Sequence, residues 1–466
     1  MCLSVSYADD ATGDSDRYGV RHANDRSVVC FRRGVLFRGA AAGHKCQRSL
    51  SSYCGLETNA PSAGFMACIS RLFRLHSCQQ RDCDPMSMSP RKERDLRIDF
   101  FRGLALVFIF IDHVPDNSWA SVTLRNFGFS DASEVFVLLA GYSAGLAYWS
   151  MCERGDFQGT WLRASRRAGQ IYIWHIGVFL ASAVLLYTAA RLFQNPDYVN
   201  NIAMAELATA PWHTLASALL LFYQPNQMNI LPMYVVLMFW LPVALFLLRK
   251  SVLLALAVSF GIWLIANIAS INLPTQHRVD GWFFNPFAWQ LLFTTGAAAS
   301  VMARRVQSYP RNALLIPIAA YLAFAFIVAA PWVQHSWLPD GRLISREIVE
   351  PMSKPDLSPW RFLHVLALAY FVAAVVPSNA AWLKRPWANA VSTCGKHSLE
   401  IFSLGTLLSF FGWIALTELG SNHLTVLAVN VVGIAIMGMT AWQMSRRAQG
   451  SSVPLRPRSS VQALAS

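Results

Sequence analysis

Long apolar segments recur along this chain, and they constrain its fold more than any other feature. A helix needs about 20 mostly apolar residues to cross the hydrocarbon core of a bilayer. Segments approaching this length lie at about 100–116, 132–150, 168–191, 230–248, 251–270, 286–303, 312–331, 361–377, 398–417 and 423–443. Because hydrocarbon cannot satisfy backbone polar groups, the pattern predicts an all-α polytopic membrane helix bundle with about ten transmembrane helices.

Composition agrees with residence in a lipid bilayer. The 466 residues are 54% hydrophobic and only 14% charged, which is typical of an integral membrane protein and excludes an ordinary soluble enzyme. The net charge of +13 comes from basic clusters between apolar segments, so we expect contact with anionic lipid and no nucleic-acid partner. A shorter apolar piece at 215–223, closed by Pro225, is expected to be interfacial or re-entrant.

Basic residues collect in alternate connections between the expected spans. Clusters such as Arg163, Arg166 and Arg167, and the pair Arg446 and Arg447 after the last span, fall on one side. The long connection at 332–360 is the exception, because acidic residues dilute its basic ones. Since lysine and arginine are enriched in cytoplasmic loops, both termini are predicted to be cytoplasmic.

The two ends of the chain differ in composition from the apolar region. Seven of the nine cysteines lie in the first 83 residues, without a CxxC pair or any metal-ligand spacing. We interpret residues 1–90 as a disordered or mis-annotated extension, with translation hypothesised to start at Met86 or Met88. Residues 446–466 are expected to form a disordered basic tail. The sequence predicts no metal site.

The first expected span carries ionisable residues on one face. Arg102 and His113 are eleven residues apart, so they return to within about 20° of the same helix face, roughly 16 Å apart along the axis. Asp99 lies one turn before Arg102, where an ion pair would lower the cost of the guanidinium near the bilayer. The alternative is structural: Arg102 snorkels to lipid phosphates and His113 bonds to a neighbouring helix.

Further polar residues gather where this span ends and the next begins. Asp112, Asp116 and Asn117 lie beside His113, and Asp131 and Glu134 open the second span. Because ionisable groups in a membrane are costly, their convergence favours a functional site. We predict His113 as a general base, oriented by Asp112, Asp131 or Glu134, among which the sequence does not choose. The expected substrate-binding residues are Arg97, Asp99, Arg102, Asp116, Asn117 and Gln290, although a Gln within a bundle more often bonds an adjacent helix.

Several segments resemble one family of membrane proteins. They include "RDLRIDFFRGLALVFIFIDHVP" at 94–115, "RNFGFSDASEVFVLLAGYSAGLAYW" at 125–149, "QPNQMNILPMYVVLMFWLP" at 224–242 and "GKHSLEIFSLGTLLS" at 395–409. The sequence resembles the OpgC-type proteins, which are related to the acyltransferase-3 membrane enzymes, over residues 94–445. Arg102 and His113 also fit the Arg, ten residues, His spacing of the wider acyltransferase-3 group.

The resemblance implies an activity, which we state as an expectation. It implies a multi-pass protein of the bacterial inner membrane that moves a succinyl group from cytoplasmic acyl-CoA to hydroxyls of periplasmic glucans. In this reading His113 is catalytic, Arg102 engages the donor, and succinyl-CoA is a co-substrate rather than a permanently bound cofactor. Alternatives are another cell-surface glycan as acceptor, acetyl-CoA as donor, or a proton-coupled anion transporter; the oligomeric state stays open.

Overall fold

The computed structural model describes residues 95–276, 278–305, 314–330 and 353–450. Throughout these ranges the regular structure is helical and contains no strand, which confirms the predicted all-α class. The described residues belong to one compact unit, Lys92–Ser466. The extension predicted over residues 1–90 lies outside them.

Each expected span coincides with one helix. These helices are α2 (Leu96–His113), α3 (Ala132–Glu153), α4 (Phe157–Leu192), α8 (Ile230–Lys250), α9 (Val252–Ile268), α10 (Pro286–Arg305), α11 (Leu315–Ala329), α13 (Pro359–Val375), α15 (Ser398–Leu419) and α16 (His423–Gly450). Short helices fill the connections: α5 (Asp197–Asn200), α6 (Glu206–Thr209), α7 (Pro211–Leu219) and α14 (Pro386–Lys396). Three 3₁₀ turns, η1 (Ser118–Val122), η2 (Leu124–Asn126) and η5 (Ala381–Lys384), complete the described set.

Five of the described helices are both long enough and apolar enough to cross a membrane, namely α3, α4, α8, α15 and α16. The apolar helices α9, α11 and α13 are shorter, with 17, 15 and 17 residues. Helix α2 has the length of a span, but Arg97, Asp99, Arg102 and Asp112 interrupt its apolar character. By length and composition these helices are those of a membrane protein.

Two helix boundaries differ most from the sequence expectation, and one helix was not anticipated. Helix α4 has 36 residues and begins eleven residues before the expected span, where Asp156 caps it by accepting a hydrogen bond from the Gly159 N–H. Its first turns are rich in arginine, so an apolar pattern does not reveal them. Helix α16 continues to Gly450, which places 446–450 in a helix and corrects the expected start of the tail. Helix α14 was not expected.

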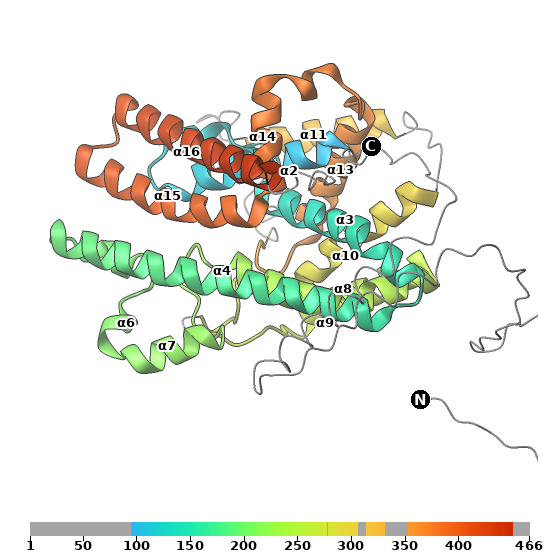
Figure 1. Cartoon of the computed structure of the whole chain (residues 1–466), viewed down its shortest axis with the longest axis horizontal. Coiled ribbons are helices and arrows are strands. Elements are labelled where there is room, and N and C mark those ends of the chain that lie inside the picture. Colours follow the sequence, from blue (N-terminus) through green and yellow to red (C-terminus); the bar gives the residue numbers. More distant parts are fainter. Residues whose placement is uncertain (1–94, 277, 306–313, 331–352, 451–466) are drawn as a thin grey trace, which may run out of the picture. The chain divides into compact units, whose positions relative to one another are not determined.

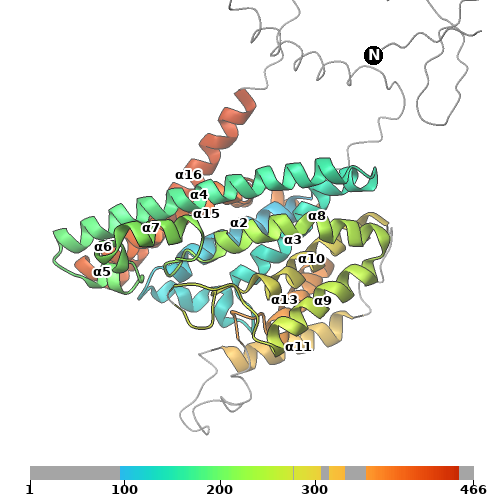
Figure 2. The same cartoon turned by 90° about the horizontal axis from the view of Figure 1, so that it is seen from below.

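Helix α2 lies against α3, α14 and α15, and α10 packs along α3 (Figures 1 and 2). Glycines permit the closest approaches. A Cβ on Gly103 would strike the Val391 carbonyl of α14, and one on Gly141 would strike the Phe293 carbonyl of α10. Glycine thus allows α3 to pack closely on α10 and α2 to pack closely on α14, and these crossings fix α2, the helix that carries Arg102 and His113.

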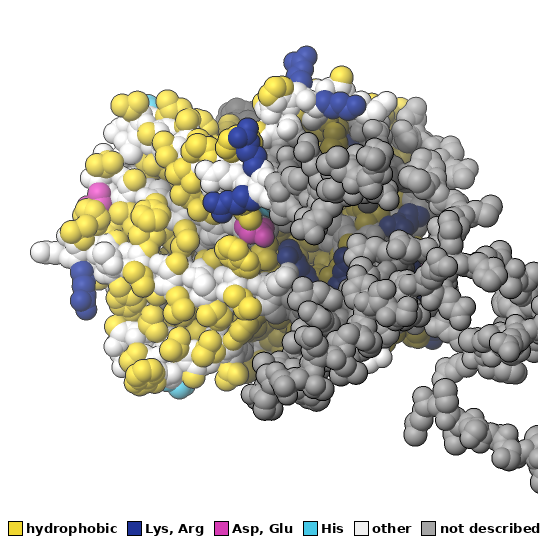
Figure 3. All heavy atoms as spheres, viewed as in Figure 1, with side chains coloured by type: hydrophobic (Ala, Val, Ile, Leu, Met, Phe, Trp, Pro, Cys, Tyr) yellow, Lys and Arg dark blue, Asp and Glu magenta, His cyan; other side chains and the backbone are white. Residues whose placement is uncertain are grey.

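The outer surface of the helices is apolar over a wide area. Figure 3 shows hydrophobic side chains covering the face formed by α4, α15 and α16. Large apolar residues are exposed on these three helices, including Val184, Phe411, Val431 and Val432. Such a surface has no stable partner in water, so it supports burial of these helices in lipid.

Candidate functional site

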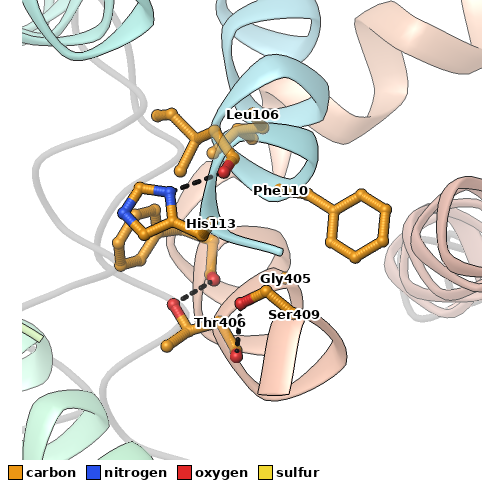
Figure 4. Close-up of a pocket in the computed structure, with 8 residues that line it drawn as sticks. Leu106, Phe110, His113, Gly405, Thr406 and Ser409 are labelled. Atoms are coloured by element: carbon orange, nitrogen blue, oxygen red, sulfur yellow. Dashed lines mark hydrogen bonds between the residues drawn. The ribbon is translucent and has the colours of Figure 1, made fainter. Parts of the chain in front are cut away.

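His113 is the last residue of α2, and its imidazole makes one hydrogen bond to its own helix. Its Nδ1 lies 2.6 Å from the backbone carbonyl oxygen of Ile109 (Figure 4). A carbonyl oxygen only accepts hydrogen bonds, so Nδ1 carries the proton and Nε2 carries the lone pair. No described group bonds to Nε2. The half-buried ring is therefore held in the tautomer that a general base requires.

A small cavity lies between the end of α2 and α15, and His113 forms part of its wall. The cavity has a volume of about 10 Å³, enough for about one water molecule or hydroxyl group. Leu106 and Ile109 line it from the stripe of α2 that also carries Arg102, and Thr406 and Ser409 line it from α15. The two hydroxyls donate to carbonyls of their own helix, Phe402 at 3.2 Å and Thr406 at 2.8 Å, and keep lone pairs for a ligand.

The connection between α7 and α8 holds the end of α2 in place. Gln227 donates from Nε2 to the backbone carbonyl oxygen of His113 at 3.1 Å. Its backbone has a φ of 70°, in the left-handed region that most side chains avoid. Because the His113 carbonyl only accepts, the amide orientation is fixed, and Oε1 is left buried without a described partner. Strain and an unsatisfied oxygen at one residue are typical of functional sites.

The remaining polar residues at the end of α2 have other partners. Asp112 accepts a hydrogen bond from the Thr123 hydroxyl at 2.6 Å. Asn117 and Asn430 form a reciprocal amide pair, with both bonds at 2.9 Å, which ties this end of the chain to α16. Asp116 is exposed and has a φ of 58°. Of the substrate-binding residues expected here, Asn117 thus has a structural role in packing, and Asp116 faces solvent.

Asp131 and Glu134 belong to a buried ion cluster. They form the capping box of α3, with the Asp131 N–H donating to Glu134 Oε2 at 2.9 Å. Arg361 of α13 donates to Glu134 at 2.7 Å and to Asp131 at 2.9 Å, and Lys354 donates to Asp131 at 2.6 Å. Burial raises the pKa of the Asp131 carboxyl, but the charges of Lys354 and Arg361 outweigh it and hold this pKa well below its usual range. Asp131 is therefore ionised at neutral pH.

The group that orients His113 differs from the expectation. Of the three carboxylates considered, none bonds to the ring, because Asp112 is engaged by Thr123 and the other two by Lys354 and Arg361. A residue in the last turn of a helix has the carbonyl four residues earlier within reach, and Ile109 supplies it. The cluster still lies near the site: the charges of Asp131 and Lys354 act on both Asp112 and His113.

At the other end of α2 lie the residues expected to meet the donor. Arg97 forms an ion pair with Asp95 at 2.6 Å and donates a hydrogen bond to the Val376 carbonyl at the end of α13. Its guanidinium therefore already has partners within the fold. Asp99 is buried beside α14. Arg102 donates to the Leu139 carbonyl of α3 at 3.0 Å. Gln290 was also expected to bind substrate, but it lies on α10. Its amide nitrogen donates a hydrogen bond to the Ser259 carbonyl of α9 at 2.7 Å, as a Gln between packed helices does.

Sequence reasoning did not select several residues at this site. Gln227, Thr406 and Ser409 surround His113, and Lys354 and Arg361 neutralise the carboxylates near it. Hydroxyls three residues apart in the apolar α15 would have been a usable signal for a polar face. Among the described residues, no three His, Cys, Asp or Glu side chains come together as metal ligands.

A comparison with protein families identifies the group to which this arrangement belongs. The family model described as OpgC protein matches residues 94–449, which is most of the chain. The chain belongs to the OpgC family. This confirms the resemblance stated from the sequence, and the match covers α2, the cavity and the ion cluster. A search of curated proteins gives no match.

Membership of the OpgC family, together with the apolar helices, describes a membrane protein of the OpgC type. The family also suggests a transferase-type activity. A protonated Nδ1 on His113 and a lone pair on Nε2 are compatible with such an activity, because group transfer to a hydroxyl needs a base to remove its proton.

Proposed function

We propose that this protein is an O-acyltransferase of the bacterial inner membrane, which moves a succinyl or similar acyl group from cytoplasmic acyl-CoA to hydroxyls of periplasmic glucans. One observation carries the proposal: the Nδ1–H of His113 is bonded to Ile109, so Nε2 carries the lone pair of a base, and His113 lines a cavity of hydroxyl size. Family membership supports the reaction class.

The reaction proceeds by direct transfer. Nε2 of His113 takes the proton of a glucan hydroxyl while the oxygen of that hydroxyl attacks the thioester carbonyl carbon. The new C–O bond forms and the C–S bond breaks. The imidazolium then gives its proton to the thiolate of coenzyme A, which leaves as the thiol. Thr406 and Ser409 donate their own protons to carbonyls, so their lone pairs accept hydrogen bonds from a neighbouring hydroxyl of the sugar or from a water, and the single proton of the attacking hydroxyl is left for Nε2.

The donor approaches along the stripe of α2 that connects Arg102 with the cavity. Leu106 and Ile109 lie on this stripe and line the cavity, so an acyl group that follows it reaches His113. Arg102 provides a positive charge on this approach. Arg97 does not share this role in our proposal, because Asp95 already neutralises it.

We further propose that α2, α3, α4, α8, α9, α10, α11, α13, α15 and α16 cross the membrane, and that both termini are cytoplasmic. Each of the ten apolar segments coincides with a helix, which supports the count of ten spans. The basic clusters lie in alternate connections, which supports the proposed sidedness. This topology places His113 at the periplasmic end of α2, where a periplasmic acceptor would meet it.

Reporter fusions test this topology. Alkaline phosphatase, which folds only in the periplasm, is expected to be active when fused after Thr275, between α9 and α10, and inactive when fused after Lys250, between α8 and α9. A fluorescent protein that matures only in the cytoplasm is expected to fluoresce after Gly450. Phosphatase activity at Lys250 would contradict the proposed sidedness.

The chemical proposal is tested on the glucan itself. Deleting the gene is expected to remove anionic substituents from the extracted periplasmic glucan fraction, measured as earlier elution in anion exchange. Expression of the intact protein should restore late elution, and mass spectrometry of the restored fraction should show an added 100 Da for each succinyl group. An unchanged elution profile after deletion would exclude periplasmic glucan as the acceptor.

A further inference from the structure

The hydroxyl of Tyr234 of α8 differs from those of Tyr198 and Tyr223, two other buried tyrosines. Its side chain is 6% exposed, yet its hydroxyl has no hydrogen-bond partner among the described residues. By contrast, Tyr223 donates to the Ala203 carbonyl at 2.9 Å, and Tyr198 donates to the Glu418 carboxylate at 2.5 Å. A buried tyrosine hydroxyl normally finds a partner, because leaving it unpaired destabilises the fold.

Ring contacts connect Tyr234 with the cavity beside His113. The Tyr234 ring packs edge-to-face against Phe136 of α3, with centroids 5.8 Å apart. Phe136 in turn stacks on Phe402 of α15 at 6.2 Å, and Phe402 lines the cavity. Two aromatic rings, those of Phe136 and Phe402, therefore connect Tyr234 with the cavity that His113 lines.

The same turn of α3 also connects Tyr234 with Arg102. Phe136, which contacts Tyr234, lies three residues before Leu139, whose carbonyl accepts the hydrogen bond of Arg102. Residues three apart are neighbours on a helix surface. The charge of Arg102 also acts on Tyr234. Tyr234 thus lies near Arg102 and, through Phe136 and Phe402, near the cavity beside which the donor reacts in the proposed function.

Packing alone does not explain the hydroxyl. Phenylalanine fills the same space with the same ring contacts and leaves no polar atom unsatisfied, so a structural role favours phenylalanine at this position. A ligand with a hydrogen-bond acceptor explains the tyrosine. A phenolic O–H donates to a carbonyl oxygen, and an acyl-CoA carries carbonyl oxygens on its thioester and on the two amides of its pantetheine arm.

We propose that the Tyr234 hydroxyl binds the acyl donor by donating a hydrogen bond to one of its carbonyl oxygens. The inference rests on the proposed function, and it adds α8 to the elements that form the donor site. It assigns Tyr234 to donor binding and not to the acceptor, since the charge of Arg102, which meets the donor in the proposed function, acts on Tyr234.

The test replaces Tyr234 with phenylalanine in the purified full-length protein. Donor binding is measured as the rise in Tm on titration with succinyl-CoA without glucan, and transfer is measured as glucan-dependent release of coenzyme A. The Tyr234→Phe variant is expected to have an unchanged or higher Tm without ligand. Its apparent Kd and KM for succinyl-CoA should rise about tenfold, with an unchanged KM for glucan, as loss of one hydrogen bond to a ligand predicts.

Tyr223→Phe is the matched control, because it removes a hydroxyl that has a protein partner. It is expected to lower Tm without ligand and to leave the Kd for succinyl-CoA unchanged. A ligand-free Tm that falls in Tyr234→Phe would show that the hydroxyl has a structural partner, and would overturn the proposal. So would an unchanged Kd for succinyl-CoA.

The titration separates this inference from the function on which it rests. If the wild-type protein binds succinyl-CoA but releases no coenzyme A with glucan, the acceptor in the proposed function is wrong, and the Kd of Tyr234→Phe still tests the donor contact. If the wild-type protein does not bind succinyl-CoA or acetyl-CoA, both proposals fail.

Discussion

Replacing His113 with asparagine is expected to abolish acyl transfer while leaving the protein folded in the membrane. The amide nitrogen of the introduced asparagine lies near the position of the imidazole Nδ1, so it can still donate to the Ile109 carbonyl and hold the end of α2. The asparagine has no basic nitrogen in place of Nε2. Since a positioned general base contributes about 10²–10⁴-fold, the rate of glucan-dependent coenzyme A release should fall by about this factor.

His397 provides the control for this substitution. It lies between α14 and α15, and its Nε2 is 2.9 Å from the Ser445 hydroxyl of α16, away from the cavity. His397→Asn should keep a transfer rate within about twofold of wild type, because this ring touches no group in the proposed reaction. Transfer by the His113→Asn variant at the wild-type rate, with an equal amount of protein in the membrane, would refute the assignment of the base.

The kinetic form of the defect distinguishes a base from a binding residue. A missing base lowers kcat and leaves the apparent KM for donor and acceptor nearly unchanged, because the proton transfer occurs only in the transition state. The Tyr234→Phe variant should instead change the KM for the donor. Substitution of His113 is therefore expected to change kcat, and substitution of Tyr234 the KM for the donor, in the same assay.

Local patterns in the sequence predicted most of the fold. Every apolar segment corresponds to a helix, because a run of about 20 apolar residues specifies a helix without reference to its neighbours. The stripe that joins Arg102 to His113 also follows from helix geometry alone. The expectation failed where a helix is polar, as in the first turns of α4, and where it is short, as in α14.

The partners of the site residues were not predictable in the same way. Arg361 and Glu134 are 227 residues apart, and Gln227 and His113 are 114 apart. Nothing in a single sequence pairs such distant positions, and the connections that supply Lys354 and Gln227 have no periodic pattern. The sequence grouped three carboxylates around His113, but the two on α3 bond to cations that the chain supplies much later.

Family membership and the site geometry constrain different parts of the function. The OpgC family fixes the general type of protein. The hydrogen bond from Nδ1 of His113 to Ile109 leaves a lone pair on Nε2, to which the proposed reaction assigns removal of the hydroxyl proton. The cavity is large enough for about one hydroxyl group and too small for an acyl chain. If transfer occurs here, the helices that line the cavity must separate to admit the thioester, and α15 is the element that faces His113.

Replacing Arg361 with methionine is expected to cause the largest loss of stability among the substitutions considered. Arg361 is the only described cation bonded to Glu134, whose side chain is fully buried, and it also bonds to Asp131. Methionine fills most of the volume but leaves a buried carboxylate unpaired. Removing one partner of a buried ion pair costs about 3–5 kcal/mol, so the free energy of unfolding in detergent should fall by about this amount.

Two further variants show that the loss comes from the charge on Glu134. Lys354→Met should cost less, about 1 kcal/mol, because Lys354 is 28% exposed and Arg361 still neutralises Asp131. The double variant Glu134→Gln with Arg361→Met should recover much of the stability lost in Arg361→Met, because it leaves no unpaired charge at position 134. The stability of Arg361→Met, Lys354→Met and the double variant is measured by thermal unfolding that is monitored by size-exclusion chromatography. A double variant that is as unstable as the sum of its single variants would show that the two side chains act independently, contrary to the ion pair that joins α3 to α13.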